Sequence, residues 1–412
     1  MHSVLFLVHR IPYPPNKGDK IRSYHLLRYL SGRYRVFLGA FVDDPFDFQY
    51  KPVVDGLCQE SLLIPIHSTR RKIASLGGLL TGEALSLPYY RNRQMQAWVD
   101  ATIERESIDT VVVFSSTMAQ FVEGDRHAAL NRIADFVDVD SDKWAQYAAR
   151  ASGPRAWIYR REAAALQKYE RAVARSFDAT LLVTQSEADL FRRIAPESAR
   201  RISHFDNGVD TEYFDPALAM DSPYAPGGPV IVFTGAMDYW PNVEAVQWFV
   251  ADVLPTVRAS RADVRFVIVG SNPTEAVVSL GRQAGVEVTG RVPDVRPYLR
   301  YADVAVAPLR IARGIQNKVL EALAMARPVV CSGPAAEGLR DSADIAAATA
   351  DDAPDFARKV LAALGGAERP SYREFVLRHY SWESQLEKVG HLIDRGAVSV
   401  RCVDAADVLS AE

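Results

Sequence analysis

Residues 304–331 read VAVAPLRIARGIQNKVLEALAMARPVVC, and this stretch contains a complete strand–helix–strand unit. Its two ends are short runs of β-branched and small apolar residues, which are typical of buried strands. Between them, apolar residues recur at helical spacing over 315–325. Two buried strands joined by a helix predict a parallel sheet, because parallel strands need a long crossover.

The same alternation of strand and helix patterns occurs in two sets along the chain. The first set predicts helices at 19–30, 91–106 and 157–176, and strands at 4–8, 36–40, 62–66, 110–114, 132–136 and 180–184. The second set predicts helices at 242–253, 295–301, 315–325 and 354–364, and strands at 230–234, 265–269, 286–289, 304–307 and 328–331. The two sets predict two doubly wound, Rossmann-like α/β domains.

A stretch rich in Pro and Gly separates the two sets near residues 206–229. We therefore expect an N-terminal domain at 1–205 and a C-terminal domain at 206–371. A helix at 372–395 is expected to pack back on the N-terminal domain, and 396–412 to form a tail. Sheets of this kind bind ligands at the carboxyl ends of their strands, so we expect the two domains to face each other across a binding cleft.

The composition fits a globular protein. The chain has 412 residues, of which 48% are hydrophobic and 24% charged, enough for two domains with cores of their own. The formal net charge of −3 gives no electrostatic reason to expect a nucleic acid as partner. Its three cysteines lie far apart without CxxC spacing, which argues against a zinc site or a disulfide framework and favours a reducing compartment.

The sequence also bears on location. The apolar run at the N-terminus is too short for a signal peptide, and no segment has the roughly 18 apolar residues of a membrane-spanning helix. We therefore expect a cytoplasmic protein. A slight basic excess in the first 200 residues is compatible with peripheral contact between the N-terminal domain and the inner membrane.

The helix expected at 315–325 has the features of a phosphate site at its start. Gly314 permits a close backbone approach, and the N–H groups at a helix start attract an anion. Arg313 and Lys318 add positive charge, so this segment can hold a diphosphate without a metal. Glu321 lies on the same helix face as Lys318 and can accept hydrogen bonds from both hydroxyls of a ribose. The alternative is a solvated Lys318–Glu321 ion pair on an ordinary helix.

The strand end and turn FTGAMDYWPN at 233–242 point to the same site. Gly235 would let phosphate oxygens approach the backbone, and Asp238, Tyr239 and Asn242 are expected to face the ligand. Arg291, in the turn VTGRVPD at 288–294, is a further candidate for contact with a base or phosphate. The alternative is an ordinary strand–turn–helix joint in which Tyr239 is a packing residue. Neither the dinucleotide-binding GxGxxG nor the P-loop motif follows a strand.

In the first domain, the loop HRIPYPPNKGDK at 9–20 follows the first strand and is stiffened by three prolines. A rigid loop at the carboxyl end of a strand is suited to positioning a substrate. The candidate acceptor-binding residues are Asn16, Lys17, Gly18, Asp19 and Arg22.

A second polar group follows the strand at 132–136, where alternation predicts Asp138 and Asp140 on one face. A carboxylate there can accept a proton from an acceptor hydroxyl or hold a sugar. Alternatively, Asp140 or Ser141 caps the helix that contains Trp144. Metal chelation by this DxD is the least favoured reading, because Arg313 and Lys318 already supply positive charge.

Taken together, these segments resemble the GT-B glycosyltransferases of family 4. The resemblance rests on NGVD at 207–210, the Thr234–Gly235 turn, Gly290, YADV at 301–304, Pro308, and the Lys318/Glu321 helix that runs into PVV at 328–330. The segments 10–22, 135–144 and 233–242 are similar to the subgroup found with exosortase/PEP-CTERM exopolysaccharide loci.

The resemblance implies that the C-terminal domain holds a nucleoside diphosphate sugar and the N-terminal domain holds the acceptor, with no metal or other cofactor. It places Glu321 at the second Glu of an E-x7-E motif, which grips the ribose. The first Glu, which touches donor-sugar hydroxyls in the family, falls on Arg313, which we expect to neutralise phosphate or a sugar carboxylate. The Gly that usually precedes the helix-ending Pro is interrupted as Ala326–Arg327, and 238–242 replaces a Gly- and Lys-rich phosphate segment.

We therefore expect a metal-independent glycosyltransferase of the hexosyltransferase type, acting on a lipid-linked or exopolysaccharide acceptor. Arg313 and Lys318 would stabilise the leaving diphosphate, and Asp138 or Asp140 would accept the proton or position the sugar. The alternatives are a GT-B-fold nucleotide-sugar epimerase or phosphorylase, and a nucleotide-sugar-binding subunit without catalysis.

Overall fold

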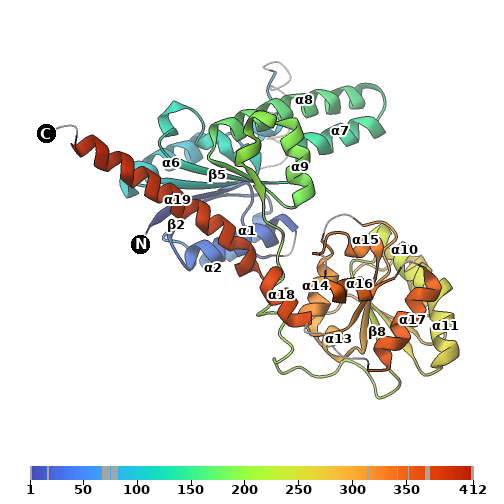
Figure 1. Ribbon diagram of the computed structural model, residues 1–412. Coiled ribbons are helices and arrows are strands. Elements are labelled where there is room, and N and C mark those ends of the chain that lie inside the picture. The colour runs from blue at the N-terminus through green and yellow to red at the C-terminus, as the bar shows by residue number, and fades with distance from the viewer. Residues whose placement is uncertain are drawn as a thin grey trace. The chain divides into compact units, whose positions relative to one another are not determined.

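The computed structural model describes residues 2–15, 18–66, 75, 82–312, 315–340, 342–350, 352–366 and 372–409. The chain divides into two compact units (Figure 1). Unit 1 contains residues 1–206 and 386–412, and unit 2 contains residues 207–385. Because both ends of the chain lie in unit 1, unit 2 is inserted into the sequence of unit 1.

Unit 1 is built on a seven-stranded sheet in which every strand pair is parallel. The strand order is β3-β2-β1-β4-β5-β6-β7. β2 and β3 are added on one side of β1, and β4 to β7 are then added on its other side. A ligand site is expected where that order reverses, between β1 and β4. The strands are β1 Ser3–Val8, β2 Arg35–Val42, β3 Glu60–Pro65, β4 Thr110–Phe114, β5 Asn131–Val137, β6 Ala179–Leu182 and β7 Ile202–His204.

Helices connect these strands, as a parallel sheet requires. Caps fix several of their starts: Asn92 Oδ1 accepts a hydrogen bond from Met95 N at 3.0 Å before α6, and Thr184 Oγ1 accepts one from Glu187 N at 3.2 Å before α9. The described helices are α1 Gly18–Ser31, α2 Lys51–Asp55, α5 Ser86–Tyr90, α6 Arg93–Glu106, α7 Asp140–Arg150, α8 Gly153–Ser176 and α9 Gln185–Ile194, with short 3₁₀ turns at η1 Pro45–Tyr50, η2 Ser116–Phe121, η3 Asp125–His127 and η4 Pro196–Arg201.

Unit 2 has a six-stranded parallel sheet with the order β10-β9-β8-β11-β12-β13. This is the Rossmann order, with its reversal between β8 and β11. The strands are β8 Val230–Thr234, β9 Arg265–Val269, β10 Val286–Gly290, β11 Val304–Ala307, β12 Val329–Ser332 and β13 Thr349–Ala350. The helices are α10 Trp240–Trp248, the π-helix η5 Phe249–Val253, α11 Leu254–Ser260, α12 Glu275–Leu280, α13 Arg296–Tyr301, α14 Asn317–Ala324, α15 Gly333–Ala336, α16 Ala343–Ala348, α17 Ala353–Leu364 and α18 Tyr372–His379.

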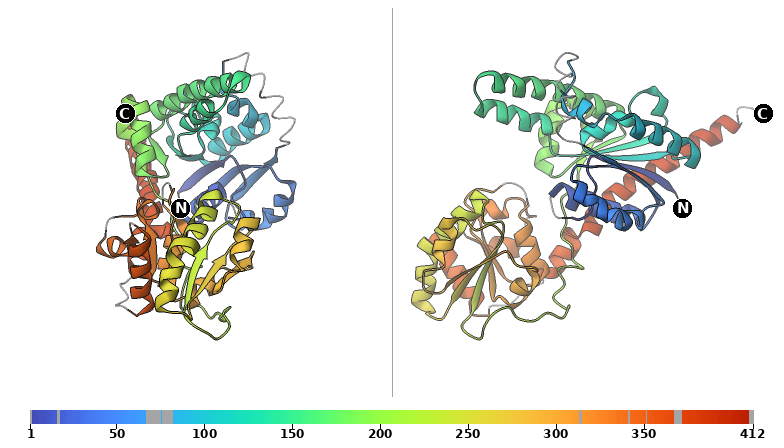
Figure 2. Two further views of the ribbon diagram at one scale, coloured as in Figure 1. Left: turned by 90° about the vertical axis from the view of Figure 1, so that its right-hand side faces the viewer. Right: turned by 180° about the vertical axis from the view of Figure 1, so that it is seen from behind.

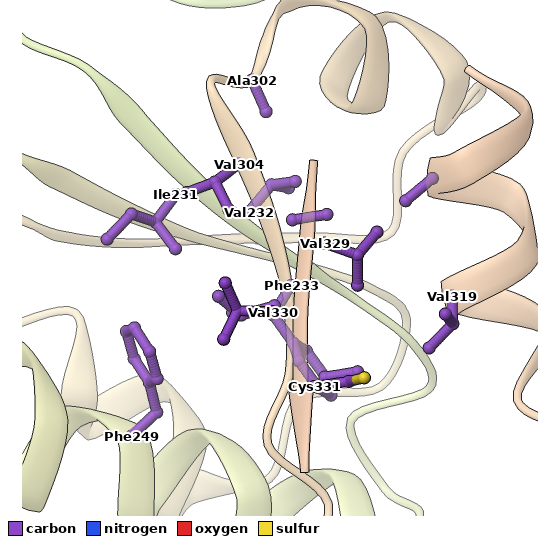
Figure 3. Close-up of a cluster of buried hydrophobic side chains, with 14 of the residues drawn as sticks. Ile231, Val232, Phe233, Phe249, Ala302, Val304, Val319, Val329, Val330 and Cys331 are labelled. Carbon is purple, nitrogen blue, oxygen red and sulfur yellow. The ribbon is translucent and has the colours of Figure 1, made fainter. Parts of the chain in front are cut away.

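The core of unit 2 lies between the sheet and the helices that flank it. Ile231 and Phe233 of β8 are fully buried, and Phe249 and Val319 meet the strands from η5 and α14 (Figure 3). Burying an aliphatic or aromatic side chain of this size contributes roughly 1.5–3 kcal/mol. The apolar face of α14 is therefore held against the sheet, which fixes the direction in which its polar face points.

The C-terminal part differs from the expected single helix and tail. It forms α18 and a second helix, α19 Trp382–Leu409. Within α19, Leu386, Val389 and Ile393 are buried, and Tyr34 Oη donates to Asp394 Oδ1 at 3.0 Å, so α19 packs on unit 1. α19 extends as far as Leu409 and so includes residues 396–409, which the sequence analysis assigned to the tail.

The two parallel sheets with flanking helices confirm the prediction of two doubly wound α/β domains. β7 and β13, the short strands at one edge of each sheet, were not predicted. Among the described residues, no helix has the length and apolar character needed to cross a bilayer.

Candidate functional site

A cavity of about 650 Å³ opens in unit 2 at the carboxyl ends of β8, β9 and β10 and at the start of α14. Five of the residues predicted to bind a donor line it: Gly235, Asn242, Arg291, Lys318 and Glu321. These residues come from three separate segments of the chain, and the topology of the sheet brings them together. The cavity adjoins β8, one of the two strands at which the sheet order reverses, as expected for a fold of this kind.

Lys318 and Glu321 occupy the polar face of α14. Val319, Leu320, Ala322 and Leu323 of the same helix are buried against the sheet, whereas Lys318 and Glu321 are half-buried and line the cavity. The helix begins at Asn317 rather than at residue 315 as predicted. Among the described residues, no ion pair joins Lys318 to Glu321, so the alternative of a solvated ion pair is not supported.

Lys318 is held by a neighbour from another element. Its Nζ donates a hydrogen bond to Asn242 Oδ1 at 2.5 Å and lies 4.2 Å from the ring centroid of Phe233. Asn242 in turn donates from Nδ2 to the carbonyl oxygen of Ala236 at 2.9 Å. That bond fixes the amide so that its oxygen faces Lys318, and the ammonium group is thereby positioned before any ligand binds.

Burial shifts the ionisation of both charged groups in the cavity. It lowers the pKa of Lys318 to about 7, although the Glu321 carboxylate opposes the shift. It also raises the pKa of Glu321 to about 7, against the effect of Lys318. An anion bound in the cavity would favour the charged form of Lys318 and raise its pKa. The site is therefore suited to a ligand that carries negative charge near Lys318.

Two glycines bring the ends of β8 and β9 together. A Cβ atom on Gly270 would lie 1.6 Å from the carbonyl oxygen of Gly235, and one on Gly235 would lie 2.7 Å from Asn242 Nδ2. Neither position can carry a side chain without displacing the backbone or the Asn242 amide. Sequence analysis missed Gly270, although a glycine directly after the strand at 265–269 was a usable signal.

Other donor-site predictions have different outcomes. Asp238 is exposed, accepts a hydrogen bond from Asn272 Nδ2 at 3.1 Å and does not line the cavity. Tyr239 lines the cavity and is 58% exposed, so it is not the packing residue of the alternative reading. Arg313 and Gly314 lie outside the described residues.

In unit 1, the candidate acceptor residues Asn16 and Lys17 lie outside the described residues, and Gly18 and Asp19 begin α1. Asp19 forms an ion pair with Arg10 and lies 3.4 Å from His9 Nε2. Burial opposes ionisation of Asp19, but the hydrogen bond from His9 and the charge of Arg10 lower its pKa to about 2. Asp19 is therefore a fixed anion at the carboxyl end of β1.

The prediction that Arg22 binds an acceptor is wrong, because the structure buries it completely. Its guanidinium group donates to both carboxylate oxygens of Asp135, at 2.9 and 3.1 Å, and to the carbonyl oxygen of Phe205 at 2.9 Å. The guanidinium carbon also lies 3.5 Å from the ring centroid of Phe205. Arg22 thus links α1 to the middle of the sheet and has a structural role.

Asp138 and Asp140 lie close to each other, as predicted, and both form ion pairs with Lys143. Lys143 Nζ is 2.6 Å from Asp138 Oδ2 and 3.4 Å from Asp140 Oδ1. Asp140 is the first residue of α7, and burial raises its pKa although Lys143 opposes the shift. The capping alternative is wrong: the cap position is Val139, and Ser141 Oγ instead donates to Glu170 at 2.5 Å.

No group of three or more His, Cys, Asp and Glu residues suited to a metal ion occurs within the described ranges. The polar part of the unit 2 cavity includes a lysine, a carboxylate, an arginine, several side-chain amides and hydroxyls, and two closely packed glycine turns. These groups can bind an anion and accept hydrogen bonds from hydroxyl groups.

Comparison with known proteins gives matches for part of the sequence and for the fold. Residues 228–365, which include the cavity, match the family model described as Glycosyl transferases group 1. No curated protein sequence matches the chain. A glycosyltransferase from Rickettsia africae ESF-5 superposes with a TM-score of 0.64 at 13% identity, covering 96% of this chain and 99% of that one.

Two further solved structures are similar. HepE of Anabaena in complex with UDP has a TM-score of 0.62 at 12% identity, covering 95% of this chain and 100% of that one. WaaG, a glycosyltransferase involved in lipopolysaccharide biosynthesis, has a TM-score of 0.54 at 16% identity, with 95% and 99% covered. At such identities the likeness concerns the fold, and it confirms the predicted fold class: two parallel-sheet α/β domains of the GT-B type.

Proposed function

We propose that the protein is a glycosyltransferase that moves a sugar from a nucleoside diphosphate sugar to a lipid-linked or exopolysaccharide acceptor. The observation that carries the proposal is that Lys318 and Glu321 both lie on the cavity face of α14, beside the Gly235 turn. The group 1 match of residues 228–365 and the UDP bound by HepE support it. The PEP-CTERM/exosortase subgroup of family 4 and a hexosyl donor are part of this proposal.

The donor chemistry follows from the cavity. Lys318, positioned by Asn242, stabilises the diphosphate, and Arg291 of the same cavity adds positive charge. On the strength of the sequence alone, Arg313 is proposed to add a further positive charge. The two carboxylate oxygens of Glu321 accept hydrogen bonds from the ribose hydroxyls. When the bond between the anomeric carbon and the diphosphate oxygen breaks, the same cations stabilise the leaving group, without a metal or other cofactor.

The acceptor side of the reaction is assigned to unit 1. Asp138 and Asp140 share Lys143, and one of them accepts the proton of the attacking hydroxyl or positions the sugar. Asn16, Lys17, Gly18 and Asp19 bind the rest of the acceptor. The protein acts in the cytoplasm, with peripheral contact at the inner membrane, where a lipid-linked acceptor lies.

The test is a panel of UDP-, GDP- and dTDP-sugars incubated with the protein, with and without a membrane extract. Release of nucleoside diphosphate that depends on the extract supports a transferase. Conversion of the sugar without release points to an epimerase, phosphate-dependent release to a phosphorylase, and binding without chemistry to a binding subunit. Any of these last three outcomes overturns the proposal.

Matched variants locate the chemistry. Lys318→Met should abolish most donor binding and turnover, because it removes the positioned cation. Lys168→Met is the control, since Lys168 is exposed on α8, outside the cavity. Equal turnover in the two variants would remove Lys318 from the mechanism.

A further inference from the structure

The hairpin formed by α7 and α8 in unit 1 has an unusual composition at its end. Residues 144–161 read WAQYAARASGPRAWIYRR, with four arginines, four aromatic residues and no Asp or Glu. This stretch covers the end of α7, the turn and the start of α8. We call it the hairpin tip. Figures 1 and 2 show the hairpin extending beyond the rest of unit 1, with its turn at the far end.

Aromatic side chains of the hairpin tip gather on its surface. Trp157 is 57% exposed and Tyr147 is 53% exposed. Trp144, Tyr147 and Tyr159 contact one another, with ring centroids 5.3 to 6.2 Å apart. The tip therefore presents large amphipathic rings to the surroundings, of the kind found where a surface is apolar on one side and wet on the other.

Three of the four arginines of the hairpin tip lack a carboxylate partner among the described residues; the fourth, Arg161, pairs with Glu162. Elsewhere in unit 1, Arg126 and Arg171 pair with carboxylates although they are exposed. Within the described part of the chain, no carboxylate pairs with Arg150, Arg155 or Arg160. Their charges are not neutralised by the protein and are available to an external anion.

Arginines and aromatic rings of the tip also line an open hollow of about 490 Å³. Its walls come from both helices and the turn, and include Tyr147, Arg150, Ser152, Arg155 and Tyr159. The Arg155 Nε group donates to Tyr159 Oη at 3.0 Å and so stays beside this hollow. Two guanidinium groups facing one hollow can hold a phosphate group between them.

We propose that the hairpin tip docks on a membrane surface that contains anionic lipids. Arginines attract anionic headgroups, and each contributes about fivefold in affinity near such a surface. Exposed Trp and Tyr rings settle at the boundary between headgroups and acyl chains. The hollow between Arg150 and Arg155 receives one lipid phosphate.

The position of the tip relates this docking to the proposed acceptor site of unit 1. α7 begins at Asp140, at the carboxyl end of the sheet, and its eleven residues give it a length of about 16 Å. A docked tip would hold Asp138 and Asp140 within about that distance of the lipid surface. The inference rests on the proposed function in one respect: a lipid-linked acceptor in the membrane would then lie close to these two carboxylates.

The test uses the full chain and sedimentation with vesicles of phosphatidylcholine alone or mixed with phosphatidylglycerol. We expect binding to the mixed vesicles, weakened at high salt, and at least about tenfold weaker binding to the neutral ones. Arg150→Glu with Arg155→Glu should reduce binding at least about tenfold, and Trp157→Ala about threefold or more. The control is Arg193→Glu with Phe46→Ala, which changes exposed residues of unit 1 outside the tip.

Equal vesicle binding by the tip variants and the wild type would overturn the proposal, as would a wild type that binds no vesicles. Inorganic phosphate and sodium chloride are then compared as agents that displace the protein from vesicles. If both displace it at the same ionic strength, the tip binds a lipid surface, as proposed. If phosphate displaces it at far lower ionic strength, the tip binds free phosphate and the proposal is overturned. Far-UV circular dichroism and thermal unfolding measured in parallel show that the variants are folded. Failure of sugar transfer with intact vesicle binding counts against the proposed function alone.

Discussion

Lys318 Nζ lies 2.5 Å from Asn242 Oδ1, so the first turns of α14 and α10 are joined inside the unit 2 cavity. The asparagine supplies an acceptor without a charge. The lysine thus keeps its ability to attract an anion, whereas a carboxylate at the same position would neutralise it. This arrangement gives the first prediction.

Asn242→Asp should weaken UDP binding about tenfold, because the new carboxylate pairs with Lys318 and repels the diphosphate. Titration calorimetry measures the change. Asn272→Asp is the control, since Asn272 lies outside the cavity and contacts Asp238. If Asn242→Asp bound UDP as tightly as this control, Lys318 would not contact the diphosphate.

The affinity for UDP should fall as the pH rises above 7. Burial lowers the pKa of Lys318 to about 7, so the free site loses its positive charge over the next units of pH. A fall of about tenfold between pH 7 and pH 9 is expected, since each unit of pKa shift corresponds to 1.36 kcal/mol. Lys318→Arg keeps its charge throughout this range. A flat profile for wild type, or the same slope for Lys318→Arg, would contradict the assignment.

Gly270→Ala should disrupt the cavity. The new methyl group would lie 1.6 Å from the carbonyl oxygen of Gly235, so one of the two turns must move. We expect a loss of about 1–3 kcal/mol in the free energy of unfolding of unit 2, together with most UDP binding. Gly333→Ala is the matched control, because no atom lies within 4 Å of its added carbon. Thermal unfolding and calorimetry report the two effects.

Arg22→Met should destabilise unit 1 by about 3–5 kcal/mol, because it leaves the buried carboxylate of Asp135 without its partner. Replacing both residues, with Arg22→Met and Asp135→Leu, should restore much of the loss. Chemical denaturation of the single and double variants measures the difference. If Arg22→Met were as stable as the wild type and had lost only activity, the structural role would be wrong and Arg22 would again be a candidate for acceptor binding.

Ala326→Gly should raise the stability of unit 2 by about 0.5–1 kcal/mol. Ala326 has a φ of 55°, and this left-handed conformation costs an ordinary residue roughly 1–2 kcal/mol. Glycine removes this strain, but it loses more backbone entropy on folding than alanine does, so the net gain in stability is smaller. The family that the sequence resembles usually has glycine before the helix-ending proline. An unchanged or lower unfolding midpoint would show that the strain is relieved elsewhere.

The strand–helix alternation was enough to predict both sheets, because their strands are continuous apolar runs of the kind that parallel sheets bury. Strands of two or three residues, such as β7 and β13, leave too short a pattern to detect. The cavity residues of unit 2 were predictable because Gly235 follows a strand, Lys318 lies in the first turn of a helix, and Glu321 lies three residues later on the same helix face. Asn242, though predicted, acquires its role only through contact with Lys318.

Arg22 shows why other site residues could not be predicted. A charged residue after a substrate loop has the same sequence signature whether it points outward or inward. Its burial depends on Asp135 and Phe205, which are remote in the sequence and meet it only when the sheet is complete. Gly270 could have been named from its place directly after a strand, but the reason that it must be glycine, the carbonyl oxygen of Gly235, is visible only in the folded structure.

The insertion of unit 2 between the two parts of unit 1 has a consequence for synthesis on the ribosome. Residues 207–385 emerge as one continuous piece, whereas unit 1 must wait for Leu386, Val389 and Ile393 of α19 to cover its surface. The nascent chain thus holds an incomplete N-terminal half while the later half is translated and folds. Truncation upstream of α19 would leave that half permanently open to proteases and chaperones.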